Sequence, residues 1–172
     1  MSVTAANRKY FVDVFQDWCV EVRALYDPLI EGVGLKTPYS YYGSILEIVN
    51  YLNIKSENTL PRYPMIALVD NEGMKQKKGI DWYEVSPVIY IFSETIEKYD
   101  PQQRYDNVIK PILFKIKEYL QDVIEFSELV SPANESTDEI EIFKGSLNGS
   151  TIPDAVDCIK LSISNLRINN NC

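Results

Sequence analysis

Two runs of mostly apolar residues, at 63–70 and 82–92, constrain the fold of this chain more than any other feature of its sequence. The first contains Met-Ile-Ala-Leu-Val at 65–69, and the second contains Val-Ile-Tyr-Ile-Phe at 88–92. Each run has the length of a strand, and neither alternates between apolar and polar residues as a half-exposed strand does. The sequence therefore predicts a sheet that helices cover on at least one face.

Apolar residues at three- and four-residue spacing predict three helices, over 4–26, 44–52 and 100–126. In the second helix, Ser44 and Glu47 have the spacing of a capping box, in which each side chain accepts a hydrogen bond from the other residue's backbone N–H group. This pattern predicts that the second helix begins directly after Ser44.

Proline is expected to end the first helix at Asp27-Pro28 and to begin the longest one at Asp100-Pro101. Pro111 lies inside the longest helix, where its ring removes a backbone hydrogen bond. We therefore expect a kink in that helix at Pro111.

Two further strands are expected, over 138–143 and 156–168. The alternation of the last strand changes phase near Asn165, which predicts a bulge. Pro87 cannot donate a hydrogen bond to a sheet, so the strand over 82–92 is expected at a sheet edge or with a bulge of its own.

These elements predict a single α+β domain over residues 1–172. The expected architecture is an antiparallel sheet of about four strands with helices packed on one face. Residues 71–81, which join the two apolar strands, are too polar to pack and too many for a tight turn. We therefore expect a long β-hairpin that projects from the domain.

The composition excludes several classes of active site. The chain has no histidine, which excludes a histidine general base, a Ser-His-Asp triad and any zinc site with a histidine ligand. Its 17 basic and 25 acidic residues give a net charge of −8, which argues against whole-surface binding to DNA or anionic lipid. Cys19, Cys158 and Cys172 are too far apart for a disulfide framework or a thiolate metal site, and the first two are better interpreted as buried structural thiols than as reactive ones. No cofactor is predicted.

Carboxylates at i,i+4 spacing on the first helix, Asp13 with Asp17 and Asp17 with Glu21, could bridge a metal ion. A solvated polar face opposite the apolar stripe explains these acids better. The N-terminal residues contain no apolar signal-peptide core, and the longest apolar stretch, 87–92, is far too short to span a membrane. A protein of the cytoplasm with no membrane contact is expected.

Opposite charges gather in two parts of the chain. The basic group is Lys75, Lys77 and Lys78, and the acidic group is Glu135, Asp138, Glu139 and Glu141. Alone, each has a simple explanation, a solvated loop for the lysines and a strand edge protected from unwanted pairing for the acids. Together they predict complementary patches on neighbouring copies of the chain. Aromatic residues near loops are candidates either for that interface or for the core: Tyr39, Tyr41, Tyr42, Trp82 and Tyr83.

Four segments carry a family resemblance. They are YYGSILEIVNYL at 41–52, YPMIAL at 63–68, PVIYIF at 87–92 and YDPQQRYDNVIKPIL at 99–113, the last with the pattern R-Y-x-x-x-(I/F)-K-P-I-L. The chain resembles, over about residues 40–120, small phage and prophage proteins from gut Bacteroides-type bacteria, with related components in crAss-like phages. Such proteins are similar to head–tail connection components, namely tail terminators, tail-completion proteins and neck ring proteins.

This resemblance implies a tail-terminator-like fold and a structural, non-enzymatic virion protein of the phage neck or tail, made in the host bacterial cytoplasm. The implied partners are copies of itself in a closed ring of six or twelve, the adjacent neck, portal or tail rings, and viral DNA that passes through the channel without sequence-specific contact. An acidic channel wall would repel this DNA and let it slide. A metal-dependent hydrolase that uses clustered Asp and Glu residues, and a cytoplasmic adaptor of unknown partner, remain alternatives.

Overall fold

The computed structural model describes residues 10–30, 38–53, 63–70, 77–78, 82–94, 100–127, 130–131, 135–143, 146–147, 150–151, 156–164 and 166–169. The helical elements are α1 (Phe11–Ile30), α2 (Ile45–Asn53), α3 (Pro101–Arg104), the π-helical segment η2 (Tyr105–Phe114) and α4 (Lys115–Phe126). The strands are β1 (Tyr39–Gly43), β2 (Met65–Val69), β3 (Lys77–Lys78), β4 (Trp82–Val85), β5 (Val88–Glu94), β6 (Val130–Ser131), β7 (Glu135–Phe143), β8 (Ser146–Leu147), β9 (Ser150–Thr151), β10 (Val156–Ser164) and β11 (Leu166–Asn169). The predicted α+β class is confirmed.

The strands form two main sheets and one small hairpin. The five-stranded sheet has the order β1-β2-β5-β10-β7, the four-stranded sheet has the order β3-β4-β11-β6, and β8 pairs with β9. Every pairing in the two main sheets is antiparallel except that of β1 with β2, which is parallel. The sequence predicted one antiparallel sheet of about four strands. This prediction missed the parallel strand β1 and the second sheet.

The two sheets meet where two long chain segments each pass from one sheet to the other. The first passes at Ser86-Pro87, between β4 and β5, and the second passes between β10 and β11. The two passages lie side by side, because the N–H group of Ile163 donates to the carbonyl oxygen of Pro87 at 3.0 Å. Ser162 pairs with Val88 and Leu166 with Val85, so the β10–β11 segment has one more residue between these pairs than the β4–β5 segment. This one-residue change of register is what the predicted bulge requires, although Asn165 itself lies outside the described residues.

Pro87 bears on a second expectation, that its strand lies at a sheet edge or carries a bulge. The register with the β10–β11 segment changes by one residue across Ser86-Pro87, with the extra residue on the β10–β11 side, and only the edge alternative is wrong. The strand that follows it, β5, lies between β2 and β10 and is not at an edge. Pro87 itself belongs to neither β4 nor β5, so its missing N–H group removes no ladder bond from either strand.

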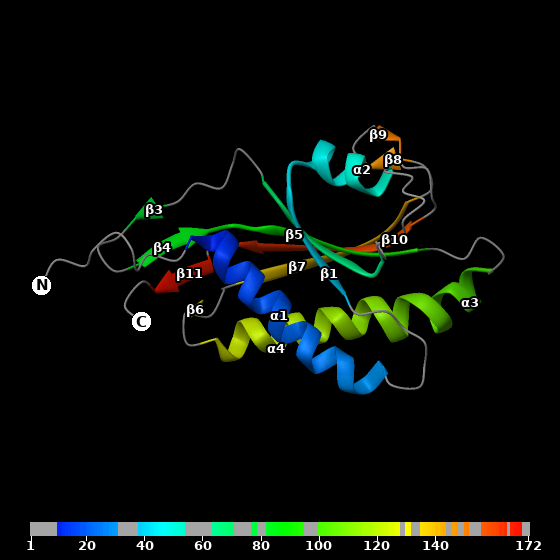
Figure 1. The fold of residues 1–172 in the computed structure, drawn as a ribbon, viewed down its shortest axis with the longest axis horizontal. Helices are drawn as coiled ribbons and strands as arrows, with labels where there is room; N and C mark the ends of the chain where they lie inside the picture. The colour runs from blue at the N-terminus through cyan, green and yellow to red at the C-terminus, as the bar shows by residue number, and fades with distance from the viewer. Residues whose placement is uncertain are drawn as a thin grey trace, which may run out of the picture.

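Helices cover both faces of the five-stranded sheet, so the expectation of helices on one face is wrong. Figure 1 shows α2 on one side of this sheet, and α1 with the long helix from α3 to α4 on the other. The larger core cluster joins α1, η2 and α4 to residues such as Leu68 and Ile91, while a smaller one joins α2 to Met65 and Phe92. All five residues of β2 are buried, as a strand covered on both faces requires.

The helix starts follow the sequence signals at α2 and α3, whereas α1 begins at Phe11 and excludes Tyr10 of the predicted 4–26, of which 4–9 lie outside the described residues. There are two further exceptions. Asp100 and Gln103 form a capping box at the start of α3, and the predicted box of Ser44 and Glu47 is confirmed at α2. The first exception is α1, which continues past Pro28 to Ile30 because a proline in the last turn removes one hydrogen bond but keeps a helical φ angle.

The second exception is the long helix, which contains ten π-helical residues around Pro111. A π-helix places the hydrogen-bonded carbonyl five residues back instead of four, so the proline is accommodated within a wider helix. The expectation of a kink identified the position of the irregularity but not its form.

The predicted hairpin arm is only partly within the described residues. Lys77 and Lys78 pair with Glu84 and Tyr83, and β4 pairs in turn with β11. The base of the arm therefore belongs to the four-stranded sheet, while 71–76 and 79–81 lie outside the described residues. Within the described part of the chain, no helix combines the length and the apolar character needed to cross a membrane.

Candidate functional site

The residues that the sequence singled out for subunit contacts lie on two strands at sheet edges. Lys77 and Lys78 form β3, the last strand of the four-stranded sheet, and Lys75 lies outside the described residues. The acidic residues all lie on β7, the last strand of the five-stranded sheet: Glu135, Asp138, Glu139 and Glu141. The expected acidic strand edge is thus present in the fold.

These two edges lie on opposite sides of the β layer. The chain from β10 to β11 passes through both sheets, with β7 and β6 paired on one side of it. Strands β5 and β4 pair on its other side, and β3 lies beyond β4. One side of the molecule therefore ends in an acidic strand and the opposite side carries a short lysine strand.

Tyr83 and Trp82 occupy neighbouring positions on β4. The side chain of Tyr83 is 6% exposed and belongs to the larger core cluster. Burial, followed by the negative charge of Asp13, raises the pKa of the Tyr83 hydroxyl to about 12. Tyr83 therefore has the core role that the sequence left open and presents little surface to a neighbour, while Trp82 stands in register with Asn169.

The paired carboxylates of α1 lie on its exposed face. Asp13, Asp17 and Glu21 are exposed, and the Asp13 carboxylate accepts a hydrogen bond from the backbone N–H of Tyr10 at 3.1 Å. This bond satisfies a free donor at the helix start. Across the described ranges, no three potential ligands from cysteine, aspartate and glutamate come together as a metal site.

The side chains of Cys19 and Cys158 are buried thiols. Burial raises the pKa of the Cys19 thiol to about 12, against a smaller opposing effect of Arg23. A thiol with this pKa stays protonated at neutral pH and is a poor nucleophile, which supports the structural interpretation.

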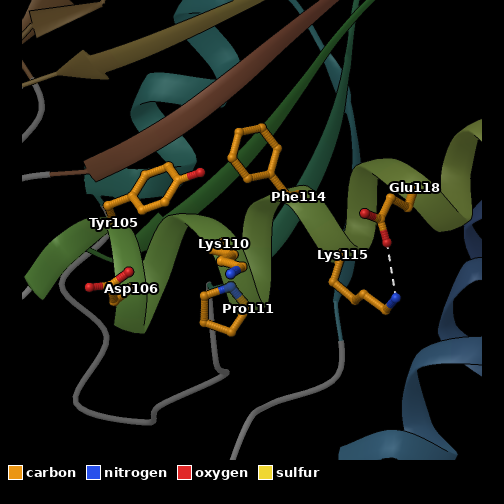
Figure 2. Close-up of a pocket in the computed structure, with 7 residues that line it drawn as sticks. All are labelled: Tyr105, Asp106, Lys110, Pro111, Phe114, Lys115 and Glu118. Atoms are coloured by element: carbon orange, nitrogen blue, oxygen red, sulfur yellow. Dashed lines mark hydrogen bonds and ion pairs between the residues drawn. The ribbon is translucent and has the colours of Figure 1, made fainter. Parts of the chain in front are cut away.

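A surface groove that the sequence did not predict opens along the π-helical segment (Figure 2). It has a volume of about 590 Å³ and is lined by Tyr105, Asp106, Lys110, Pro111, Phe114, Lys115 and Glu118. The rings of Tyr105 and Phe114 meet edge to face with centroids 6.2 Å apart. Lys115 donates to Glu118 at 2.9 Å, and this hydrogen bond, with the attraction of the carboxylate, raises the pKa of Lys115.

Beneath the start of this segment, Arg104 forms an ion pair with Asp157 of β10. The Asp157 side chain is fully buried, and the Arg104 side chain is 20% exposed. Atoms Oδ2 of Asp157 and Nε of Arg104 have no hydrogen-bond partner among the described residues. The pair joins the beginning of the long helix to the start of β10.

The sequence offered one signal for this pair. Positions 157, 159, 161 and 163 share the sheet face beneath the long helix, and Asp157 is the acid among apolar residues in that set. A buried acid requires a partner, and Arg104 opens the R-Y-x-x-x-I-K-P-I-L segment. Within this segment, Arg104 therefore forms the ion pair with the buried Asp157, while Tyr105, Lys110 and Pro111 line the groove.

Comparison with known proteins gives no matching family model and no matching curated relative.

Proposed function

We propose that this chain is a structural subunit that assembles head to tail with copies of itself into a ring of a phage neck or tail. The observation that carries the proposal is the position of the acidic strand β7 and the lysine strand β3 on opposite sides of the β layer. A head-to-tail contact joins two different surfaces of one molecule, and it closes into a ring when the rotation between neighbours divides a full turn.

Electrostatics favours this contact over a two-fold one. A symmetric contact of β7 with β7 would place acids against acids, and a contact of β3 with β3 would place lysines against lysines. Like charges opposite one another in paired strands destabilise the pairing. Contact between the two different sides brings opposite charges together, which also directs the encounter of two copies that each carry a net charge of −8.

The phage role rests on the family resemblance of residues 40–120, and the fold supplies surfaces that suit it. A ring of a neck or tail contacts other rings above and below through surfaces distinct from its subunit contacts. The groove along η2 is such a surface, because its lining residues come from the long helix and none comes from β3 or β7 (Figure 2). In this proposal the partners are neighbouring neck, portal or tail rings and the DNA that passes through the channel, and the protein catalyses no reaction.

The experiment reverses charge on one side at a time. The variants are Lys77→Glu with Lys78→Glu, and Glu139→Lys with Glu141→Lys, compared with Lys110→Glu with Lys117→Glu on the long helix. Native mass spectrometry and light scattering at low salt measure the assembly. Each edge variant should lose the assembly that the wild type forms, and the long-helix variant should keep it. Edge variants that assemble like the wild type would contradict the proposal.

A further inference from the structure

We infer that the five-stranded sheet continues from one copy to the next, with β7 of one copy paired antiparallel along β1 of its neighbour. This inference rests on the proposed function and specifies its contact. The occupant of the β1 edge is thus a second copy of this chain.

Strand β1 is the other end of the five-stranded sheet. Its inner side is satisfied by β2, since Tyr39 donates to the Pro64 carbonyl and Gly43 accepts from the N–H group of Asp70, both at 2.9 Å. In a parallel ladder, residues alternate between bonding one neighbour and facing the other side. Ser40 and Tyr42 therefore direct their backbone N–H and C=O groups outward, and both residues are exposed. These groups are available to a partner strand.

The strand directions suit such a contact. β1 runs parallel to β2, and three antiparallel pairings then lead through β5 and β10 to β7. β7 consequently runs opposite to β1. A neighbour related by a simple lateral step presents its β7 antiparallel to β1. The two strands can then form the hydrogen bonds of an antiparallel pair, perpendicular to the strands, without any structural change within either copy.

The register of the sheet specifies which residues meet. Two rows of partners cross all five strands, namely Tyr39–Met65–Phe92–Cys158–Glu141 and Tyr42–Leu68–Ile89–Leu161–Asp138. Continuation of these rows into the next copy places position 141 beside Tyr39 and position 138 beside Tyr42. Five residues of β1 can pair in this way with the middle of β7.

Charge disfavours a second β7 as the partner of β7, and strand direction and register then favour β1. The acids of β7 disfavour its pairing with a second β7, and β1, with the sequence Tyr-Ser-Tyr-Tyr-Gly, contains no carboxylate. The guanidinium of Arg23 donates two hydrogen bonds to the Pro38 carbonyl, of 3.1 and 3.3 Å, directly before β1. Positive charge therefore lies at the end of β1 where Glu141 arrives, while the carboxylates of Asp70 and Glu47 lie near Tyr42 at the end where Asp138 arrives. In the same arrangement the lysines of β3 face β6 of the neighbour, beside the start of its β7.

Disulfide cross-linking tests this register. The variant carries Tyr42→Cys and Asp138→Cys in a Cys172→Ser background. Within one chain these positions are separated by four strand spacings, roughly 19 Å, which is beyond the limit of about 7 Å between the Cα atoms of a disulfide. Any disulfide between them must therefore join two copies. Mild oxidation should give a ladder of covalent oligomers that ends at the size of the ring.

The matched control is Tyr42→Cys with Thr137→Cys, because adjacent strand residues face opposite sides of the sheet and this pair should give no ladder. A second variant, Ser40→Pro, removes an outward N–H group and should abolish assembly with an unchanged circular dichroism spectrum, whereas Ser40→Thr should keep it. An assembled protein that instead cross-links through Lys78→Cys with Asp138→Cys would overturn the β1 contact and leave the proposed function standing. A wild type that stays monomeric, with no cross-linking from any pair, would overturn both.

Discussion

The central and the edge strands of the five-stranded sheet differ sharply in what covers them. β2, β5 and β10 lie between two layers of helix, and their buried residues include Leu68, Ile89 and Ile159, each 0% exposed. The edge strands β1 and β7 have tyrosines and acids at the corresponding rows. The centre supplies the buried core, and the edges supply the surfaces through which the proposed assembly would form.

Among substitutions in the central strands and the helices that cover them, loss of the buried ion pair should lower the free energy of unfolding most. Arg104→Met leaves the fully buried Asp157 without its partner, and an uncompensated buried charge costs about 3–5 kcal/mol of unfolding free energy. Urea denaturation measures this loss. Arg167→Met removes an exposed pair with Glu84 of 3.1 Å and should cost at most about 1 kcal/mol. Equal losses in the two variants would show that Asp157 is not buried as described.

Two leucines of α2 test how this helix packs on its face of the five-stranded sheet. Leu52 is 0% exposed and Leu46 is 60% exposed on the same helix. Leu52→Ala should lower the unfolding free energy by about 2–5 kcal/mol, because it leaves a cavity between α2 and the sheet. Leu46→Ala should change it by no more than about 0.5 kcal/mol. A small effect at Leu52 would mean that α2 does not cover this face.

The cap of α2 should contribute less and should depend on pH. Ser44→Ala removes the side chain that bonds the Glu47 N–H group, which costs about 1 kcal/mol. Hydrogen bonds from the Ser44 backbone and side chain lower the pKa of the Glu47 carboxyl. The stabilisation from a lowered carboxyl pKa is present above the unfolded value and is lost as pH falls through the folded value. The Tm of Ser44→Ala should therefore lie below that of the wild type at neutral pH, and this difference in Tm should become smaller in acid. A difference in Tm that does not depend on pH would exclude this role of Glu47.

Substitutions on the edge strand β7 should change the free energy of unfolding least. Glu139→Gln with Glu141→Gln should change the unfolding free energy of the monomer, measured at high salt, by only about 0.5 kcal/mol. The same variant should assemble more weakly than the wild type at low salt, as light scattering would show. Strong destabilisation of the monomer would remove the distinction between the centre and the edges.

The sequence predicted those features that depend on a few neighbouring residues. The capping box of Ser44 and Glu47, the N-cap at Asp100 and the antiparallel pairing of β2 with β5 are all confirmed. The acidic strand was expected at an edge, and β7 is one. In each case the chemistry of the residues themselves limits the structures that they can adopt.

Features that depend on distant parts of the chain were missed. Pro87 indicated an interruption of a strand, but only pairing with β10 and β11 makes that interruption a passage between two sheets. Pro111 indicated an irregular helix but not its π-helical form, and the ion pair at the start of this segment joins Arg104 to Asp157, 53 residues away. The groove along η2 is lined by residues of η2 and α4 together, and no pattern of neighbouring residues marks it in the sequence.

The mass of the purified wild type in solution tests the central claim most directly. Native mass spectrometry at low salt, with electron microscopy of the same sample, should show one closed oligomer in the shape of a ring, and raised salt should weaken it. A monomer at every concentration, or a dimer with two-fold symmetry, would contradict head-to-tail assembly through opposite edges of the β layer.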